Sequence, residues 1–532
     1  MKRITVGTQV VKALELLDVE VIFGIPGVHT VELYRGLEAT KIRHVTARQE
    51  QSAGFMADGY ARLSGKPGVC FVITGPGVTN ILTPMAQARA DSIPLLIFST
   101  VNDGGQKNKA VGPLHDLPNQ EMLVKQIALE SFTIKKADET TSTILKAFSI
   151  MLSKRPGPVH IQIPVGVLTE PAKKISKLSA NYKFSKSIPR RKMDTIRYKI
   201  DGSQNPLILI GGGTQSSKNS VKKLVEKLDC PVISTVNARD VLGEHPLHIP
   251  GSPSLEEVRK VIKNADLIIA IGTELGETDY DMFQDNLFPE FPNLVRVDID
   301  KVQLRKSSAK SLTLRADSKV FCDSILPLVL QKNNHRAQKI VATCNQIIKS
   351  QLSEGYGTCQ LLLRTIVENL PNAILVGDST QPIYLGNLYC ELSVKNRWFN
   401  SATGYGTLGY ATPAAIGAKI ASPERPVICI IGDGGIQFTL SELGTARDEN
   451  IAVFFLIWNN YEYKEIRTYM ESKNISPIGT NPKPPKFDLL AKSYNLDYKA
   501  IKSSKELSEA LLKFAETSKS IIVELNENQF GK

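Results

Sequence analysis

The chain has 532 residues, too many for a single hydrophobic core, and this length predicts about two to four domains. The 42% apolar and 22% charged residues are ordinary for a globular protein, and no stretch has the roughly twenty apolar residues of a membrane span. The net charge of +12 raises nucleic-acid binding as a function. The basic residues are widely spread, however, and their one concentration, residues 173–199, is typical of a solvated linker. Nucleic-acid binding is therefore the disfavoured class.

The N-terminus and the cysteines both bear on the compartment. Residues 1–8 contain two basic residues but no apolar core of a signal peptide. The seven cysteines are scattered, odd in number and without a Cys-x-x-Cys pair, which is expected of buried free thiols in a reducing compartment. We therefore expect a cytoplasmic protein.

Short apolar strands alternate with helices in the first third of the chain. Strands are expected at 19–23, 42–45, 69–73, 94–99 and 159–163, and helices at 8–17 and 51–63. Glycine turns at 24–27 and 74–80 each lead from a strand into a helix. This alternation predicts a parallel doubly wound sheet. We assign residues 1–180 to this domain and residues 181–200 to a basic linker.

A second alternation predicts a Rossmann-like central domain at residues 201–335. Its strands are expected at 206–210, 231–234 and 265–271. Gly211, Gly212 and Gly213 follow the first of them and are compatible with dinucleotide binding. A short glycine run is a weak signal, so a structural turn is the favoured interpretation.

The third unit, residues 340–532, contains the most informative motif. Its strands are expected at 373–376, 427–431, 451–458 and 520–524, so the whole chain is predicted to be an α/β protein with three doubly wound, mostly parallel sheets. Asp433, between glycines, follows the second of these strands, and Asn459-Asn460 follows the third. Parallel strands end at one edge of a sheet, so Asp433 and Asn460 are expected side by side as oxygen ligands for Mg²⁺. Taken alone, the Asp433 turn would be interpreted as a surface turn, and the Asn459-Asn460 pair as unrelated to it.

With this pattern the chain resembles thiamine-diphosphate enzymes of the acetolactate synthase and pyruvate decarboxylase superfamily over essentially its whole length. The resemblance implies a pyrimidine-binding, a central and a diphosphate-binding domain, in that order. It also implies a homodimer or homotetramer, because active sites in this family lie between subunits. Asp433 and Asn460 would bind Mg²⁺ through side-chain oxygens, and Glu462 through its backbone carbonyl.

The resemblance also implies which residues contact thiamine diphosphate. Glu50 matches the glutamate that donates a proton to the pyrimidine ring, a task suited to a carboxyl group whose pKa is raised by an apolar pocket. Taken alone, Glu50 would be interpreted as a helix-start carboxylate, and Leu408, which matches the residue that bends the cofactor, as core. The other matching positions are Thr74, Asn80, Ser379, Thr380, Gln381, Gly406, Gly434 and Gly435.

The implied reaction is decarboxylation of a small-molecule 2-oxo acid through a C2 carbanion, with the cofactor as electron sink. Release of an aldehyde and acetolactate synthase-type joining of two 2-oxo acids are alternative outcomes. Acetolactate synthases carry a Phe-Gln-Glu segment where this chain has residues 112–120, and pyruvate decarboxylases have a His pair there, of which His115 represents one. The closest resemblance is to 5-guanidino-2-oxopentanoate decarboxylases, in residues 24–34, 114–118, 377–382 and 458–466.

Three further residues are candidates for catalysis or substrate binding. Glu465, one turn beyond the metal ligands, is a candidate for bidentate binding of a guanidinium group; a solvated helix residue paired with Lys or Arg is the equal alternative. His29 and His115 are candidates for proton transfer, with merely hydrogen-bonded histidines as the alternative.

Two other classes of function stay open. A flavin- or nucleotide-binding enzyme would use the central domain, since acetolactate synthases hold FAD without needing its redox chemistry, although no motif here supports FAD directly. A non-catalytic relative is disfavoured because Glu50, Asp433 and Asn460 are all present.

Overall fold

The computed structural model describes residues 4–103, 112–178, 188–291, 293–333, 336–393, 395–517 and 519–531. These residues contain three sheets of six strands each, and every pairing between named strands is parallel. The predicted α/β class with three doubly wound sheets is confirmed. Within the described residues, no helix is long and apolar enough to cross a membrane.

The N-terminal unit has the strand order β2-β1-β3-β4-β6-β5. Helix α1 begins after Thr5, whose side chain caps it, and α3 ends at Gly65, which has a φ of +69° and so stops the helix in the left-handed region. Residues 181–187 of the expected linker lie outside the described residues. The elements are α1 (Val6–Leu16), β1 (Val21–Gly24), α2 (Val31–Leu37), β2 (Arg43–Thr46), α3 (Glu50–Ser64), β3 (Gly68–Val72), α4 (Pro76–Asp91), β4 (Leu95–Val101), α5 (Gln120–Lys125), β5 (Glu130–Thr133), α6 (Thr140–Ser153), β6 (Pro158–Pro164) and α7 (Val165–Leu168).

The central unit has the strand order β12-β11-β10-β7-β8-β9. Helix α8, residues 190–202, includes the end of the segment assigned to a linker, and it buries Met193, Ile196 and Ile200 against this unit. Apolar residues three and four apart give the helix one buried face, which explains why this basic segment is folded. The elements are α8 (Arg190–Gly202), β7 (Pro206–Ile210), α9 (Lys218–Leu228), β8 (Val232–Ser234), β9 (His248–Ile249), α10 (Glu256–Lys263), β10 (Leu267–Ile271), α11 (Glu277–Tyr280), β11 (Leu294–Asp298), α12 (Lys301–Arg305), β12 (Leu312–Arg315) and α13 (Ser318–Ile325).

The C-terminal unit has the strand order β14-β13-β15-β16-β18-β17. Its inner strands are apolar and buried on both faces, as parallel sheets covered by helices require. The elements are α14 (Ala337–Asn369), β13 (Ile374–Gly377), α15 (Gln381–Leu388), β14 (Arg397–Asn400), α16 (Ala411–Ala421), β15 (Val427–Gly432), α17 (Asp433–Ile436), α18 (Glu442–Asp448), β16 (Phe454–Asn459), α19 (Lys464–Ser472), α20 (Phe487–Ser493), β17 (Asp497–Ile501), α21 (Ser504–Ala515) and β18 (Ile521–Asn526).

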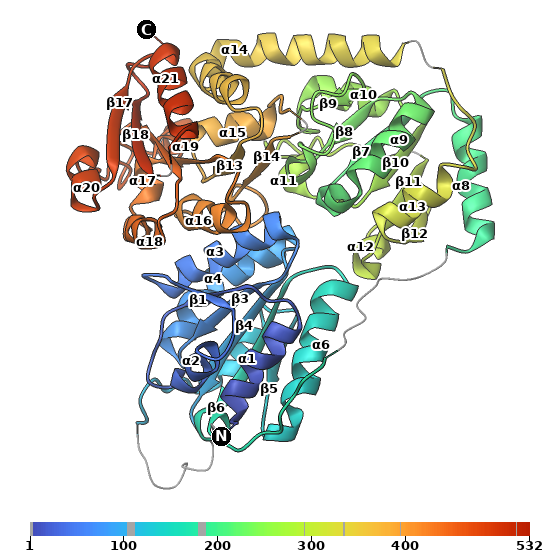
Figure 1. Cartoon of the computed structure of the whole chain (residues 1–532). Helices are drawn as coiled ribbons and strands as arrows, with labels where there is room; N and C mark the ends of the chain where they lie inside the picture. The colour runs from blue at the N-terminus through green and yellow to red at the C-terminus, as the bar shows by residue number, and fades with distance from the viewer. Residues whose placement is uncertain are drawn as a thin grey trace.

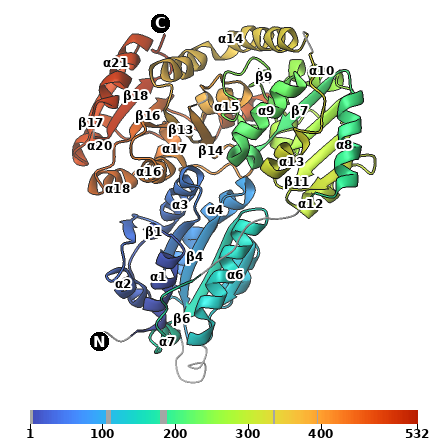
Figure 2. The same cartoon turned by 45° about the vertical axis from the view of Figure 1, so that its right-hand side comes forward.

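Helices α3 and α14 each link the C-terminal unit to one of the other two units. Figures 1 and 2 show α14 running along one side of the molecule from the central to the C-terminal unit, while α3 of the N-terminal unit faces α16. Glycines let α3 and α16 approach closely: a Cβ on Gly59 would lie 2.0 Å from the carbonyl oxygen of Ala414, and one on Gly417 would lie 1.9 Å from that of Met56. The N-terminal and C-terminal sheets are therefore held together by helix packing.

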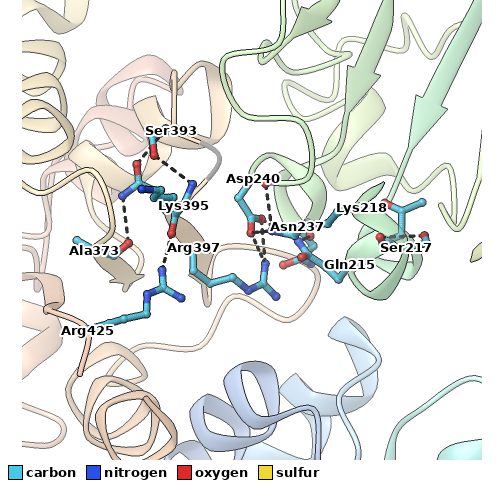
Figure 3. A network of polar contacts seen from close by, with 12 residues as sticks. Gln215, Ser217, Lys218, Asn237, Asp240, Ala373, Ser393, Lys395, Arg397 and Arg425 are labelled. Atoms are coloured by element: carbon cyan, nitrogen blue, oxygen red, sulfur yellow. Dashed lines mark hydrogen bonds and ion pairs between the residues drawn. The ribbon is translucent and has the colours of Figure 1, made fainter. Parts of the chain in front are cut away.

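An ion-pair network joins the central unit to β14 (Figure 3). The buried carboxylate of Asp240 accepts hydrogen bonds from Arg397 at 2.9 Å, from Lys218 at 2.8 Å and from Gln215 at 2.8 Å. Burial alone would raise the pKa of Asp240, but the charges of Arg397 and Lys218 outweigh burial, so the pKa is lowered. The carboxylate stays ionised and ties the two units together.

Candidate active site

The Asp433 turn and the Asn459-Asn460 pair come together at one edge of the C-terminal sheet. Strand β15 pairs with β16 in a register that places Gly432 beside Trp458, so the two turns leave the sheet side by side. The backbone N–H of Asn460 donates to Oδ1 of Asp433 at 3.4 Å. The structure thus brings the predicted ligands into contact.

The donor set at this turn fits a hard cation. Asp433 is 1% exposed, burial raises its pKa to about 6, and its Oδ2 has no hydrogen-bond partner. A buried carboxylate oxygen without a partner is costly unless a ligand binds it. The described residues contain no group of three or more His, Cys, Asp or Glu side chains placed to hold a metal, so a site here must include amide or backbone oxygens, which Mg²⁺ accepts.

The carboxylate of Glu462 forms an ion pair with Arg467. Its Oε2 accepts a hydrogen bond from Nε of Arg467 at 2.5 Å, and its backbone N–H donates to Oδ1 of Asn460 at 3.3 Å. The carboxylate is therefore engaged by α19, and a metal contact through the carbonyl of Glu462 stays a prediction.

The predicted diphosphate residues lie on the neighbouring strand end. Ser379 and Thr380 follow β13, which pairs with β15, and Gln381 is the first residue of α15, whose N-terminal N–H groups are suited to an anion. A Cβ on Gly434 would lie 2.3 Å from the ring of Tyr463, so only glycine fits there. A Cβ on Gly435 would lie 3.5 Å from the carboxyl group of Asp378.

The glycine loop before α16 adopts the left-handed conformation that its sequence predicts. Gly404, Gly406 and Gly409 have φ values of +68°, +73° and +77°. Leu408 is half-buried and therefore is not a core residue of the single chain. Buried Asp378 accepts hydrogen bonds from the backbone N–H groups of Ala411 and Ser379 and so joins this loop to the turn at Ser379.

Asp378 was not singled out from the sequence, although an acidic residue directly after a buried strand and before Ser-Thr was a usable signal. Burial raises its pKa to about 6, while hydrogen bonds from backbone N–H groups oppose this rise.

The N-terminal unit contributes a second group of predicted residues. Glu50, the first residue of α3, is half-buried and accepts a hydrogen bond from Nδ2 of Asn80 at 2.9 Å. Nδ1 of His29 lies 3.1 Å from the hydroxyl of Thr74, and the rings of His29 and His115 meet edge to face at 5.4 Å. Burial and the neighbouring His115 lower the pKa of His29.

Gln120 holds this second group in place and was not predicted. Its Oε1 accepts from the backbone N–H of Gly75 at 3.1 Å, and its Nε2 donates to the carbonyl of Thr100, whose hydroxyl bonds that of Thr74 at 2.8 Å. These partners are distant in the sequence, so no local pattern indicates the role.

The two groups are separate in the single chain. Within the described part of the chain, neither Glu50 nor the two histidines form a hydrogen bond or ion pair with the C-terminal unit. Glu465 is exposed on α19, and no cation in the described residues pairs with it.

A cavity of about 920 Å³ lies between the units at the ends of β7, β10 and β11. Gly211, Gly212, Gly213 and Gly272 line it where the strand order reverses, a place where α/β proteins bind ligands. A Cβ on Gly211 would lie 2.4 Å from the carbonyl oxygen of Gly272, so this glycine is also required for the close approach of the two turns.

Comparison with known proteins identifies the family. Family models match residues 4–127 (thiamine pyrophosphate enzyme, N-terminal TPP binding domain), 193–325 (central domain) and 379–525 (C-terminal TPP binding domain). The chain is 36% identical to the probable 2-ketoarginine decarboxylase AruI of Pseudomonas aeruginosa, over 96% of this chain and 91% of that protein.

Acetolactate synthases are also similar. Identity is 30% to the isozyme 1 large subunit of Escherichia coli, over 86% of this chain and 82% of that protein. Identity is 31% to the acetolactate synthase large subunit of Buchnera aphidicola subsp. Acyrthosiphon pisum, over 87% of this chain and 83% of that protein. The chain therefore belongs to the thiamine pyrophosphate enzyme family, and it is an enzyme that uses thiamine diphosphate.

Proposed function

We propose that the enzyme decarboxylates a 2-oxo acid with a cationic side chain, 5-guanidino-2-oxopentanoate, using thiamine diphosphate and Mg²⁺. The relative named as a probable 2-ketoarginine decarboxylase supports this substrate because it is similar over nearly the whole of both chains. The observation that carries the proposal is the exposed carboxylate of Glu465, on the helix that follows the Asp433–Asn460 turn in the chain, for which the described residues show no ion-pair partner.

Glu465 differs from every charged neighbour on α19. Arg467 binds both Glu462 and Glu471, and Lys464 is paired with Glu527. Glu465 has no such partner among the described residues, in a chain with a net charge of +12. A guanidinium group bound by two parallel N–H···O bonds would supply the missing cation.

Asp433, Asn460 and the carbonyl of Glu462 are proposed to hold Mg²⁺. The unpartnered Oδ2 of Asp433 supports this assignment. Ser379, Thr380, Gln381, Gly434 and Gly435 would bind the diphosphate, since they surround the strand ends next to the metal turn.

The remaining roles follow the family pattern. When bound, thiamine diphosphate supplies the electron sink for loss of CO₂. Glu50, held by Asn80, would give a proton to the pyrimidine ring. The carbonyl of Gly406 would accept a hydrogen bond from the amino group of that ring, and Leu408 would contact the cofactor. His29 and His115, which contact each other beside Thr74, are placed to move protons on the substrate side.

A second copy of the chain is proposed to complete the site, as a homodimer or as part of a homotetramer. Both groups of site residues are bordered by large exposed apolar side chains: Val28 and Leu114 are 67% and 61% exposed beside the histidines, and Tyr461 and Ile466 are 51% and 55% exposed beside the metal turn. Clustered exposed apolar residues mark interaction surfaces. The pyrimidine-binding domain would then be residues 1–180, the central domain residues 201–335, and the diphosphate-binding domain residues 340–532.

The test is a screen for CO₂ release with pyruvate, branched-chain, aromatic and guanidino 2-oxo acids in the presence of thiamine diphosphate and Mg²⁺. We expect the guanidino acid to have the highest kcat/KM and to yield an aldehyde. An acetohydroxy acid from pyruvate would instead favour carboligation, the alternative that the acetolactate synthase relatives support. Unchanged turnover of the guanidino acid by Glu465→Gln would contradict the role of Glu465.

A further inference from the structure

The loop of residues 401–410, between β14 and α16, is buried at both ends and exposed in the middle. Thr403 is 7% exposed and Tyr410 is fully buried, whereas Gly406 is exposed and Leu408 is half-buried. Gly406 and Leu408 are the proposed contacts of the cofactor in this loop. What holds the two ends therefore bears on where these contacts lie.

The first end of the loop is held by helix α4. The hydroxyl of Thr403 donates to Oδ1 of Asp91 at 2.9 Å. Nε2 of Gln87 donates to the carbonyl of Thr403 at 3.2 Å and to Oδ2 of Asp91 at 2.8 Å. A Cβ on Gly404 would lie 2.9 Å from Cβ of Ala90, so the helix also lies directly against the backbone of the loop. Both the hydroxyl and the carbonyl of Thr403 are thus bonded to one turn of α4.

The second end of the loop is held by helix α3. The hydroxyl of Tyr410 donates to the buried carboxylate of Asp58. Arg62, one turn further along α3, donates to Asp58 at 2.6 Å and to Asp91 at 2.6 Å, so it joins the groups that hold the two ends. Its guanidinium group also lies 5.2 Å from the ring centroid of Phe399, at the end of β14, and 6.0 Å from that of Tyr410.

The charged groups of this network are buried and paired. The side chains of Asp58, Arg62 and Asp91 are at most 3% exposed. Breaking one of these pairs would leave a desolvated charge, so the network favours a single geometry. Helices α3 and α4 lie at the end of the N-terminal unit that faces the C-terminal unit (Figures 1 and 2). The same two helices carry Glu50 and Asn80 near their starts.

We propose that four side chains of α3 and α4 act as positioning residues for the loop, and so for the pyrimidine half of thiamine diphosphate, an inference that rests on the proposed function. We call these four side chains the loop clamp: Asp58, Arg62, Gln87 and Asp91. The clamp acts through the ends of the loop.

The hydrogen bonds of the loop explain how its ends affect its middle. The backbone N–H of Gly406 donates to the carbonyl of Ser401 at 3.1 Å, so the exposed middle is bonded back to the buried first end. Within the described residues, the clamp forms no hydrogen bond with the proposed diphosphate turn at residues 379–381. Loss of a bond to the clamp should therefore weaken contacts with the pyrimidine ring and spare those with the diphosphate.

The test compares thiamine diphosphate with inorganic diphosphate, which lacks the pyrimidine ring. Both affinities are measured by calorimetry with Mg²⁺, on the full-length protein after removal of bound cofactor and metal. Thr403→Val and Tyr410→Phe each remove one hydroxyl that bonds a clamp carboxylate and keep the rest of the side chain. A hydrogen bond to a charged group contributes about a factor of ten or more, so we expect each variant to bind thiamine diphosphate about tenfold more weakly and inorganic diphosphate within about twofold of the wild type.

Tyr60→Phe and Thr140→Val are the matched controls. The hydroxyl of Tyr60 donates to Glu20 at 3.1 Å from the same helix as Asp58, and the hydroxyl of Thr140 donates to the carbonyl of Ala137 at 2.9 Å. Both side chains are buried, and neither of these bonds involves the loop. These two variants should keep both affinities. Circular dichroism of all four variants verifies that they are folded.

Two results would overturn the inference. Equal weakening of both ligands would mean that the clamp supports the C-terminal unit as a whole. Wild-type affinity for thiamine diphosphate in either variant would mean that the loop is positioned without the clamp at that end. The proposed function fails separately: a wild type that binds thiamine diphosphate but does not decarboxylate the guanidino acid overturns the proposed substrate and leaves the clamp intact, because the calorimetry uses no substrate.

Discussion

Arg62→Met tests whether a buried charge network holds the three units together. The Arg62 side chain is 2% exposed; its Nε donates to Asp58 at 2.6 Å and its Nη2 to Asp91 at 2.6 Å. Asp91 also accepts from Asn237 of the central unit and Thr403 of the C-terminal unit, and Tyr410 donates to Asp58. Methionine fills similar space but leaves two buried carboxylates without their cation.

The expected cost follows from the burial of all three groups. Removing one partner of a buried ion pair costs about 3–5 kcal/mol, because the remaining charge stays desolvated. Burial already raises the pKa of Asp58 against the opposing charge of Arg62. Without Arg62 this pKa rises further, so the folded variant takes up a proton more readily than the unfolded chain does. The destabilisation should therefore be larger at pH 8 than at pH 5.5.

The assay is guanidinium unfolding followed by the fluorescence of Trp398 and Trp458, which are both buried in the C-terminal unit. Arg364→Met is the control, because the Arg364–Glu368 pair is 68% and 66% exposed and should contribute less than about 1 kcal/mol. Equal effects of the two variants, or a cost for Arg62→Met that does not depend on pH, would refute the reasoning.

Three other predictions concern pH and the cofactor. Burial lowers the pKa of His248 to about 4, so the free energy of unfolding should fall as pH drops below about 6.5, by up to roughly 3 kcal/mol at pH 4. In urea unfolding, His248→Gln should lose less stability than the wild type between pH 7 and pH 5. Parallel plots of stability against pH for the two proteins would contradict this. Asp433→Asn should weaken the binding of thiamine diphosphate with Mg²⁺ at least about tenfold by calorimetry, because the buried ligand charge is lost. Removal of Mg²⁺ from the wild type with EDTA should weaken cofactor binding to a similar extent. Wild-type affinity in the variant would exclude the proposed metal site. Glu50→Gln can keep the hydrogen bond from Asn80 but cannot transfer a proton. The kcat in steady-state assays should therefore fall about a hundredfold or more, while cofactor affinity changes little. Unimpaired turnover would remove Glu50 from the proposed mechanism.

Local sequence patterns were sufficient for most of the inner strands and for the meeting of the Asp433 and Asn460 turns. Apolar runs followed by glycine turns predicted most inner strands within about two residues, because a strand buried on both faces must be apolar along its length. Asp433 and Asn460 were expected side by side for the same reason: consecutive parallel strands end at one edge, and β15 and β16 do so. Helix α8 was missed because its basic composition obscured an apolar stripe at helical spacing.

Only the tertiary structure decided which distant side chains share an environment. Three contacts join residues from separate elements. His29 contacts His115, Gln120 accepts a hydrogen bond from the turn after Thr74, and Arg62 pairs with carboxylates on two helices. No periodicity encodes such contacts, since they depend on how the helices pack over the sheets.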